Sequence, residues 1–148
     1  MNLHLEAMRV LLSTQPLSQV QDLPTESVSP VAAPDLSITK SVNPGVVAEN
    51  GQLTYTFLIE NYGNTEASAA DNVVITDTFN PILTGISVSY NKTAWAEPAN
   101  YTYNETNGSF ATVAGQITVP AATFTQDAVT GIITTTPGTA TVTVTGTI

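Results

Sequence analysis

The chain contains no cysteine among its 148 residues. Without thiols there can be no disulfide, thiolate nucleophile, zinc–thiolate site or iron–sulfur cluster. Positive charge is also scarce, since Lys and Arg together number 3 against 12 Asp and Glu, and the formal net charge is −9. Because three basic side chains cannot neutralise a phosphate backbone, we expect no nucleic-acid partner. The same shortage argues against docking on anionic lipid.

Long apolar runs are missing as well. No stretch reaches the about 18–20 apolar residues that a spanning helix needs, so the sequence predicts no membrane span. Residues 1–13 carry one arginine and a short apolar run, which is a poor match to a secretory signal. Export therefore either used a segment that is not in this chain or did not follow that route.

Residues suited to catalysis are sparse. The single histidine, His4, has no evident partner for Ser-His-Asp chemistry. Asp77-Thr78-Phe79 departs from the aspartic-protease triplet at its third residue, and no Gly-rich stretch has the spacing of a phosphate-binding loop. We predict no enzymatic activity, no catalytic residue, no cofactor and no metal site. A loose calcium site at Glu66 and Asp71 is the alternative to a solvated acidic surface.

Threonine, in contrast, is abundant, with 25 residues, while charged residues make up only 10% of the chain. Threonine is β-branched and stiff at χ1, which disfavours helix and suits a half-exposed strand. Hydrophobic residues make up 42%, which is enough for a packed core. The composition therefore predicts a folded, all-β protein.

Residues 1–34 differ from the rest and are predicted to form an N-terminal arm with a Pro-rich linker. The prolines of this segment block helix and donate nothing to a strand ladder, so the linker is expected to be extended. The apolar residues before them are the candidate assembly residues of the arm: Leu3, Leu5, Met8, Val10 and Leu12. Their spacing fits both a helix and a strand, and the two alternatives stay open.

From residue 35 onward, apolar and polar residues alternate with a period of two. The cleanest example is 139–148, where Ala140, Val142 and Val144 share one face and threonines occupy the other. Short strands that recur about every 8–12 residues are typical of a two-sheet sandwich. We predict an immunoglobulin-like β-sandwich of about 7–9 strands over residues 35–148. The expected strands are 36–42, 53–59, 73–79, 86–90, 101–103, 110–113, 117–119, 132–135 and 140–148.

Several sequence blocks occur in an order that resembles a known repeat. They are Asp35-Leu-Ser-Ile-Thr-Lys-Ser-Val, Asn50-Gly-Gln-Leu-Thr-Tyr-Thr-Phe, Ile59-Glu-Asn-Tyr-Gly-Asn-Thr and Val73-Val-Ile-Thr-Asp-Thr-Phe. Over residues 35–148 the chain resembles the repeat called domain of unknown function eleven, in its clostridial type, which occurs in bacterial and archaeal surface proteins. This resemblance implies a small sandwich that serves as a structural module and has no enzymatic activity.

Lys40 and Asp77 share the strand parity of core-facing apolar positions, where an unpaired charge is costly. One interpretation is that Lys40 lies near a strand end and meets Asp77 at the rim, with its amine in water. The other rests on a resemblance to pilin sandwich domains, in which a buried lysine condenses with an asparagine under a nearby carboxylate to form an isopeptide crosslink. The final strand, 140–148, offers no Asn or Asp as acceptor, which counts against that crosslink. It would leave the intact mass short by one ammonia.

Two functions compete. The first is a structural subunit of a surface appendage, filament or envelope layer, which self-associates into a homopolymer by donating its arm as a strand to a neighbour. In the alternative, the arm is disordered or folds back on its own domain, and the chain is an adhesin or carbohydrate-binding module that uses loops 61–72 and 92–108. Trp95, Tyr101 and Tyr103 then either form a sugar-binding platform or cap the core. The expected location is extracellular, on a cell or spore surface.

Overall fold

The computed structural model describes residues 9–12 and 32–148, and these residues are mostly β-strand with almost no helix. The all-β prediction is therefore confirmed. One short 3-10 turn, η2 (Ala69–Asp71), lies between two strands. The strands are β1 (Arg9–Leu12), β2 (Leu36–Asn43), β3 (Gln52–Asn61), β4 (Val73–Thr78), β5 (Thr84–Tyr90), β6 (Thr93–Trp95), β7 (Tyr101–Asn104), β8 (Ser109–Thr112), β9 (Thr123–Gln126), β10 (Ile133–Thr136) and β11 (Gly138–Thr147).

The larger sheet has the strand order β2-β3-β11-β5-β6, and its registered pairs are antiparallel. Its central strands are the two with the clearest alternation in the sequence. Phe57 on β3 lies opposite Val142 on β11, and both are fully buried. On the other face, the hydroxyls of Thr54 and Thr145 lie 3.0 Å apart in a cross-strand hydrogen bond. Alternation thus places one face of each strand in the core and a threonine-rich face outward.

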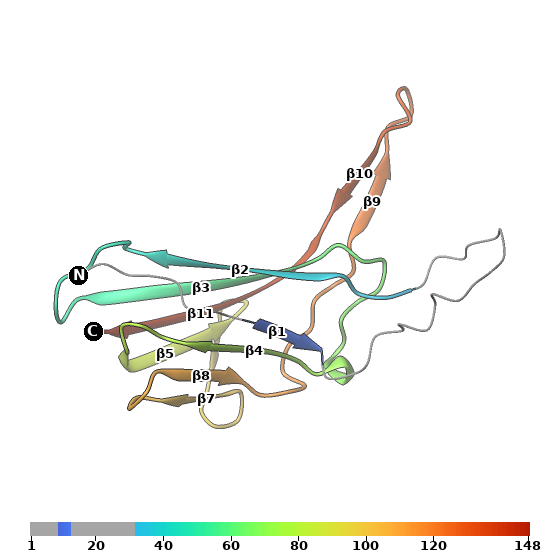
Figure 1. Cartoon of the computed structure of the whole chain (residues 1–148). Coiled ribbons are helices and arrows are strands. Elements are labelled where there is room, and N and C mark those ends of the chain that lie inside the picture. The colour runs from blue at the N-terminus through green and yellow to red at the C-terminus, as the bar shows by residue number, and fades with distance from the viewer. Residues whose placement is uncertain (1–8, 13–31) are drawn as a thin grey trace.

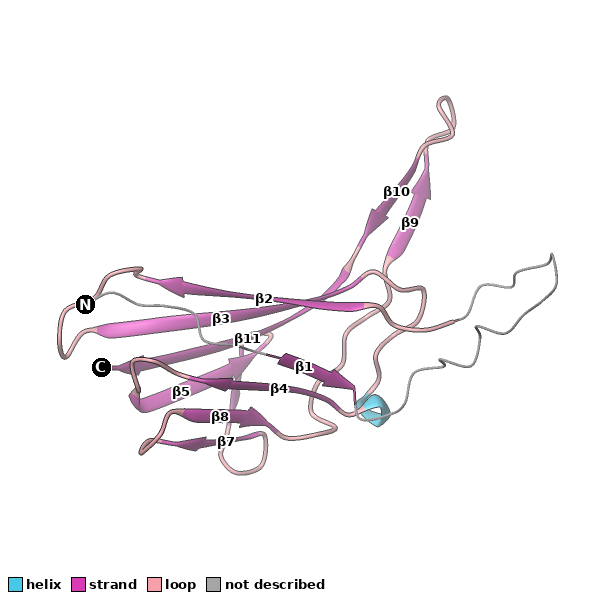
Figure 2. Ribbon diagram, viewed as in Figure 1, coloured by secondary structure: helices cyan, strands magenta, loops and turns pink. Residues whose placement is uncertain are grey.

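The smaller sheet has the order β1-β4-β8-β7 (Figure 1, Figure 2). The core lies between it and the larger sheet, as in a β-sandwich. The ring centroids of Phe57 on β3 and Phe110 on β8 are 6.2 Å apart, and those of Tyr55 and Phe79 are 4.9 Å apart. Burial of such side chains stabilises the fold by about 25 cal/mol per Å² of apolar area.

A separate hairpin of β9 and β10 projects from the body of the molecule (Figure 1). Every residue of both strands is exposed, including the apolar Phe124 and Ile133, which are 51% and 63% exposed. The hairpin leaves the body beside Gly138, where an added Cβ would lie 1.8 Å from the carbonyl oxygen of Pro120. Only glycine therefore fits where the hairpin joins β11.

The strand pattern differs from the prediction in three places. The described residues hold eleven strands in three sheets, whereas two sheets of about 7–9 strands were expected. Ile117 and Val119 are fully buried, as alternation indicates, but this segment forms no strand beyond an isolated bridge from Val119 to Ala67. The short β6 and the exposed β9 were not expected, because neither has a buried apolar face to produce alternation.

The buried side chain of Asn61 joins the backbone before β2 to the loop that follows β3. Its Oδ1 accepts hydrogen bonds from the N–H of Asp35 at 3.0 Å and of Gly63 at 2.9 Å. Its Nδ2 donates to the carbonyl oxygen of Thr65 at 2.8 Å. Asn61 is 0% exposed, so water cannot replace these partners without rearrangement. It thereby fixes the point at which the chain enters β2.

We expect Asn61→Ala to lower the free energy of unfolding by about 2–4 kcal/mol, because it leaves two N–H groups without their acceptor. Urea denaturation followed by tryptophan fluorescence measures the loss. Asn64→Ala is the matched control, since Asn64 is exposed and its Oδ1 accepts a 3.3 Å hydrogen bond from the N–H of Ala33. The control should cost about 0.5 kcal/mol. Equal losses in the two variants would contradict the role of Asn61.

Candidate functional site

The outer edge of β4 is covered by β1, a strand from the predicted arm. Arg9 to Leu12 pair antiparallel with Val73 to Thr76, with Leu12 opposite Val73 and Arg9 opposite Thr76. The other edge of β4 pairs with β8 over Thr76–Thr78. In the sequence, β1 is joined to β2 only through residues 13–35, so it is an edge strand on a long connection. The β4 edge is therefore a strand-binding site that this chain occupies with its own arm.

The predicted arm residues fall into two groups. Val10 and Leu12 lie in β1, opposite Ile75 and Val73, both of which are fully buried. Leu3, Leu5 and Met8 lie outside the described residues. Of the helix and the strand left open by the sequence, the strand is observed for residues 9–12. This strand is folded back onto its own domain, which was one of the alternatives for the arm.

Lys40 and Asp77 are brought together from different sheets, β2 and β4. The Lys40 Nζ lies 2.5 Å from Asp77 Oδ2, and both side chains are 0% exposed. The Asp77 Oδ1 also accepts a hydrogen bond from the N–H of Thr78 at 2.9 Å. The pair is therefore buried in the core, and the amine does not extend to water at the rim. Parity correctly indicated that both residues face inward, but it carried no information on their distance.

Aromatic rings surround the amine. The Lys40 Nζ lies 4.3 Å from the centroid of the Tyr55 ring, 5.6 Å from that of Phe79 and 5.9 Å from that of Phe57. Ring faces stabilise a cation, and the effect grows when water is excluded. The site thus holds one positive and one negative group in an otherwise apolar environment that connects the two sheets.

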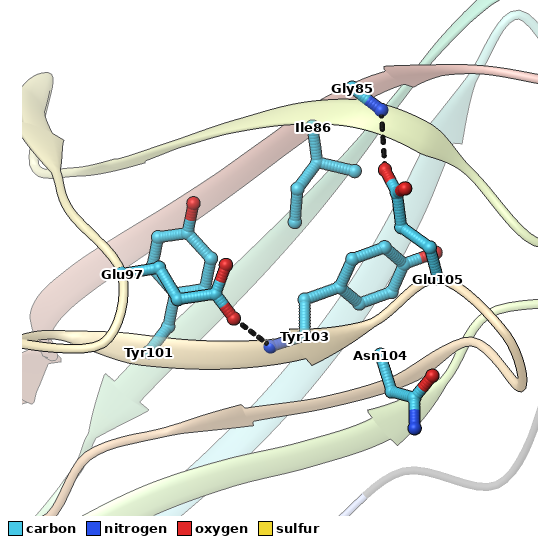
Figure 3. A pocket seen from close by; sticks show the side chains of 7 residues that line it. All are labelled: Gly85, Ile86, Glu97, Tyr101, Tyr103, Asn104 and Glu105. Atoms are coloured by element: carbon cyan, nitrogen blue, oxygen red, sulfur yellow. Dashed lines mark hydrogen bonds between the residues drawn. The ribbon is translucent and has the colours of Figure 1, made fainter.

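An open pocket of about 610 Å³ lies between β5 and β7 and is lined by two carboxylates and two tyrosines (Figure 3). Glu97 accepts a hydrogen bond from the N–H of Tyr103 at 2.6 Å, and Glu105 accepts one from the N–H of Gly85 at 2.8 Å. Each carboxylate therefore has a structural role in holding a loop. Sequence reasoning missed this pair, because Glu97 and Glu105 converge only when loop 96–100 folds back on β7.

The aromatic residues near this pocket pack on the core and do not form an exposed platform. The Tyr103 hydroxyl donates to the carbonyl oxygen of Leu83 at 2.7 Å and accepts from the Leu83 N–H at 3.0 Å. Burial raises the pKa of Tyr103, and the nearby Glu105 adds to the increase, although the contact with Leu83 opposes it. Tyr101 is 6% exposed, and Trp95 stacks on Tyr90 at 4.9 Å.

Of the two candidate calcium residues, Asp71 is engaged by the backbone of its own turn. Asp71 Oδ2 accepts from the N–H of Ser68 at 2.8 Å, which caps the η2 turn, and Glu66 is not part of this contact. No group of three potential metal ligands occurs in residues 9–12 and 32–148. Within the same residues, no helix is long and apolar enough to cross a membrane.

Comparison with known families, curated proteins and solved structures finds no match to this chain. The resemblance of residues 35–148 to the surface-protein repeat therefore stays a prediction from the sequence blocks. The β4 edge and the buried Lys40–Asp77 pair are the two features of the fold that bear on function.

Proposed function

We propose that this protein is a non-catalytic structural subunit of a bacterial surface appendage, filament or envelope layer. Its folded part is an immunoglobulin-like β-sandwich, and subunits associate when β1 of one copy pairs with the β4 edge of the next. The observation that carries the proposal is the pairing of an arm strand, Arg9–Leu12, with an otherwise open sheet edge.

The same strand–edge contact forms within one chain or between two. Exchange replaces the pairing of β1 with its own β4 by an identical pairing with a neighbour, so the contact energy per strand is nearly unchanged. The connection through residues 13–31 sets the reach, and 19 residues span at most about 60 Å. Because donor and acceptor are different surfaces, the contact is head-to-tail and extends into a filament unless it closes into a ring.

The projecting hairpin of β9 and β10 is a second feature that bears on assembly. The N–H of Ala122, at the base of β9, donates to the carbonyl oxygen of Gly63, and the N–H of Ala33 donates to Asn64 of the same loop. The hairpin therefore starts beside the point where the linker enters the domain. An isolated two-stranded hairpin is only marginally stable in water. The exposed apolar side chains of Phe124 and Ile133 support the proposal, because contact with an adjoining subunit would remove them from water.

Negative-stain electron microscopy of the full chain and of a chain that lacks residues 1–31 tests this function. We expect filaments or ordered oligomers only when the arm is present. Val10→Asp with Leu12→Asp should also abolish them, because these positions lie opposite the buried Ile75 and Val73. Leu11→Asp is the matched control, since its partner Val74 is only half-buried, and it should retain assembly.

Monodisperse monomers of the full chain and of the arm-deleted chain would overturn the assembly proposal. The second candidate, an adhesin or binding module, would then be favoured by the open pocket lined by Glu97, Asn104 and Glu105. This pocket lies within the loop region 92–108 and offers carboxylate and amide groups that can hydrogen-bond a sugar. Glycan-array binding by the arm-deleted chain would distinguish that function.

A further inference from the structure

Four Asn-x-Ser/Thr sequences, the acceptor motif for N-linked glycans, occur in the chain, and all of them lie within residues 91–109. They begin at Asn91, Asn100, Asn104 and Asn107. The motif alone does not identify a site in a chain that is rich in asparagine and threonine. The structure distinguishes the four, because a sugar can be attached only to a side-chain amide nitrogen that is exposed and free to react.

Two of the four asparagines are held by contacts with other segments. Asn100 is half-buried, its Oδ1 accepts a hydrogen bond from the N–H of Ala96 at 3.0 Å, and its Nδ2 donates to Oε1 of Gln116 at 2.7 Å. Asn91 is exposed, but its Oδ1 accepts from the N–H of Thr141 on β11 at 2.8 Å. The N–H of Asn91 also donates to the carbonyl oxygen of Thr141. A sugar on Asn100 would displace Gln116, and the amide of Asn91 is fixed against the larger sheet.

Asn104 and Asn107, in contrast, are exposed at the connection between β7 and β8. Oδ1 of Asn104 accepts from the N–H of Thr106 at 2.8 Å, and Oδ1 of Asn107 accepts from the N–H of Ser109 at 2.9 Å. Each amide oxygen is thus turned back onto the hydroxyl residue of its own motif. Neither Nδ2 has a hydrogen-bond partner among residues 9–12 and 32–148, so both nitrogens are accessible.

We propose that Asn104 and Asn107 are acceptor sites for N-linked glycans and that Asn91 and Asn100 are not. The donor is a sugar joined through its C1 to the diphosphate of a polyisoprenyl lipid, and a transferase that recognises the motif brings the two together. Nδ2 attacks C1, the bond from C1 to the diphosphate oxygen breaks, and its electron pair leaves with the diphosphate. A proton of Nδ2 passes to a base of the transferase, which leaves the sugar on an Nδ2–C1 bond.

This inference rests on the proposed surface location, because the motif is glycosylated in exported chains. In the order β1-β4-β8-β7, β7 is the edge of the smaller sheet opposite to β1. An open sheet edge invites pairing with another chain, and a bulky glycan at the end of β7 would hinder that pairing. The edge of β4 that pairs with β1 faces the other way, so it stays accessible to the arm of a neighbour.

Transfer of a glycan to the folded full chain in vitro tests the sites. The purified chain is incubated with a single-subunit oligosaccharyltransferase and an oligosaccharide linked to polyisoprenyl diphosphate, and we expect its intact mass to rise by one or two glycans. Thr106→Val with Ser109→Ala should abolish this rise, because it disables both motifs of the turn and keeps their asparagines. Thr93→Val with Thr102→Val is the matched control, since it disables the other two motifs, and it should leave the rise unchanged. All four substituted residues are exposed, so the variants should fold.

A rise in mass that persists in the chain with Thr106→Val and Ser109→Ala would overturn the assignment, because the glycan would then lie on another residue. Loss of the rise in the control chain would overturn it as well. No rise for the wild-type chain, while a short Asn-x-Thr peptide is glycosylated in the same reaction, would overturn the proposal as a whole. These masses do not depend on filament formation, so failure of this inference and failure of the proposed function are distinguishable.

Discussion

Lys40→Met is expected to lower the free energy of unfolding by about 3–5 kcal/mol, one of the largest losses available to a single substitution in this protein. The Asp77 carboxylate would then remain fully buried without the cation that contacts it. Asp77→Leu should cost a similar amount, because it leaves the ammonium among the Tyr55, Phe57 and Phe79 rings. Denaturant midpoints, with the slope checked for two-state behaviour, measure both losses.

The double variant, Lys40→Met with Asp77→Leu, is expected to recover much of the loss. Neither charge is then buried, and the new side chains keep the branching pattern of the old ones among apolar neighbours. Lys92→Met is the matched control for the loss of a lysine, because Lys92 is exposed, and it should change stability by about 0.5 kcal/mol at most. A double variant as unstable as the sum of the two single variants would contradict the argument that burial of an unpaired charge causes the loss.

A disulfide between β1 and β4 is expected to trap strand exchange as a covalent ladder. Leu11 lies opposite Val74 in the register, and directly opposed residues have Cβ atoms about 4.5–5.5 Å apart. Small shifts bring such a pair within the range of a disulfide. Because the chain has no cysteine of its own, Leu11→Cys with Val74→Cys introduces the only two thiols. Oxidation of assembled protein should give multimers on a non-reducing gel, and reductant should collapse them to monomer.

If β1 instead pairs with β4 of its own chain, each disulfide forms within a monomer, and no multimers appear on the non-reducing gel. Each single-cysteine variant is a control, since it can form no species larger than a covalent dimer. Intramolecular bonds alone in an assembled sample would contradict exchange as the basis of assembly. Absence of either kind of disulfide would contradict the register of Leu11 with Val74.

The sequence alone determined the features that depend on local alternation. Period-two patterns predicted β2, β3, β5 and β11 closely, and the parity of Lys40 and Asp77 correctly placed both in the core. These predictions succeed because they depend only on neighbouring residues: a strand with one buried face must carry an apolar residue at every second position. Composition alone was enough for the all-β class, since threonine and other β-branched residues favour strand over helix.

Only the tertiary structure decided which segments meet. Lys40 contacts Asp77 across two sheets, and residues 9–12 reach the β4 edge from far along the chain. Alternation states which face a residue occupies, but not which strand lies opposite, because many pairings bury the same face equally well. A strand was expected at 132–135, where β10 lies, but its partner β9 was missed for the converse reason. With no buried face, β9 is specified by its pairing with β10, and that pairing leaves no periodic signal in the sequence.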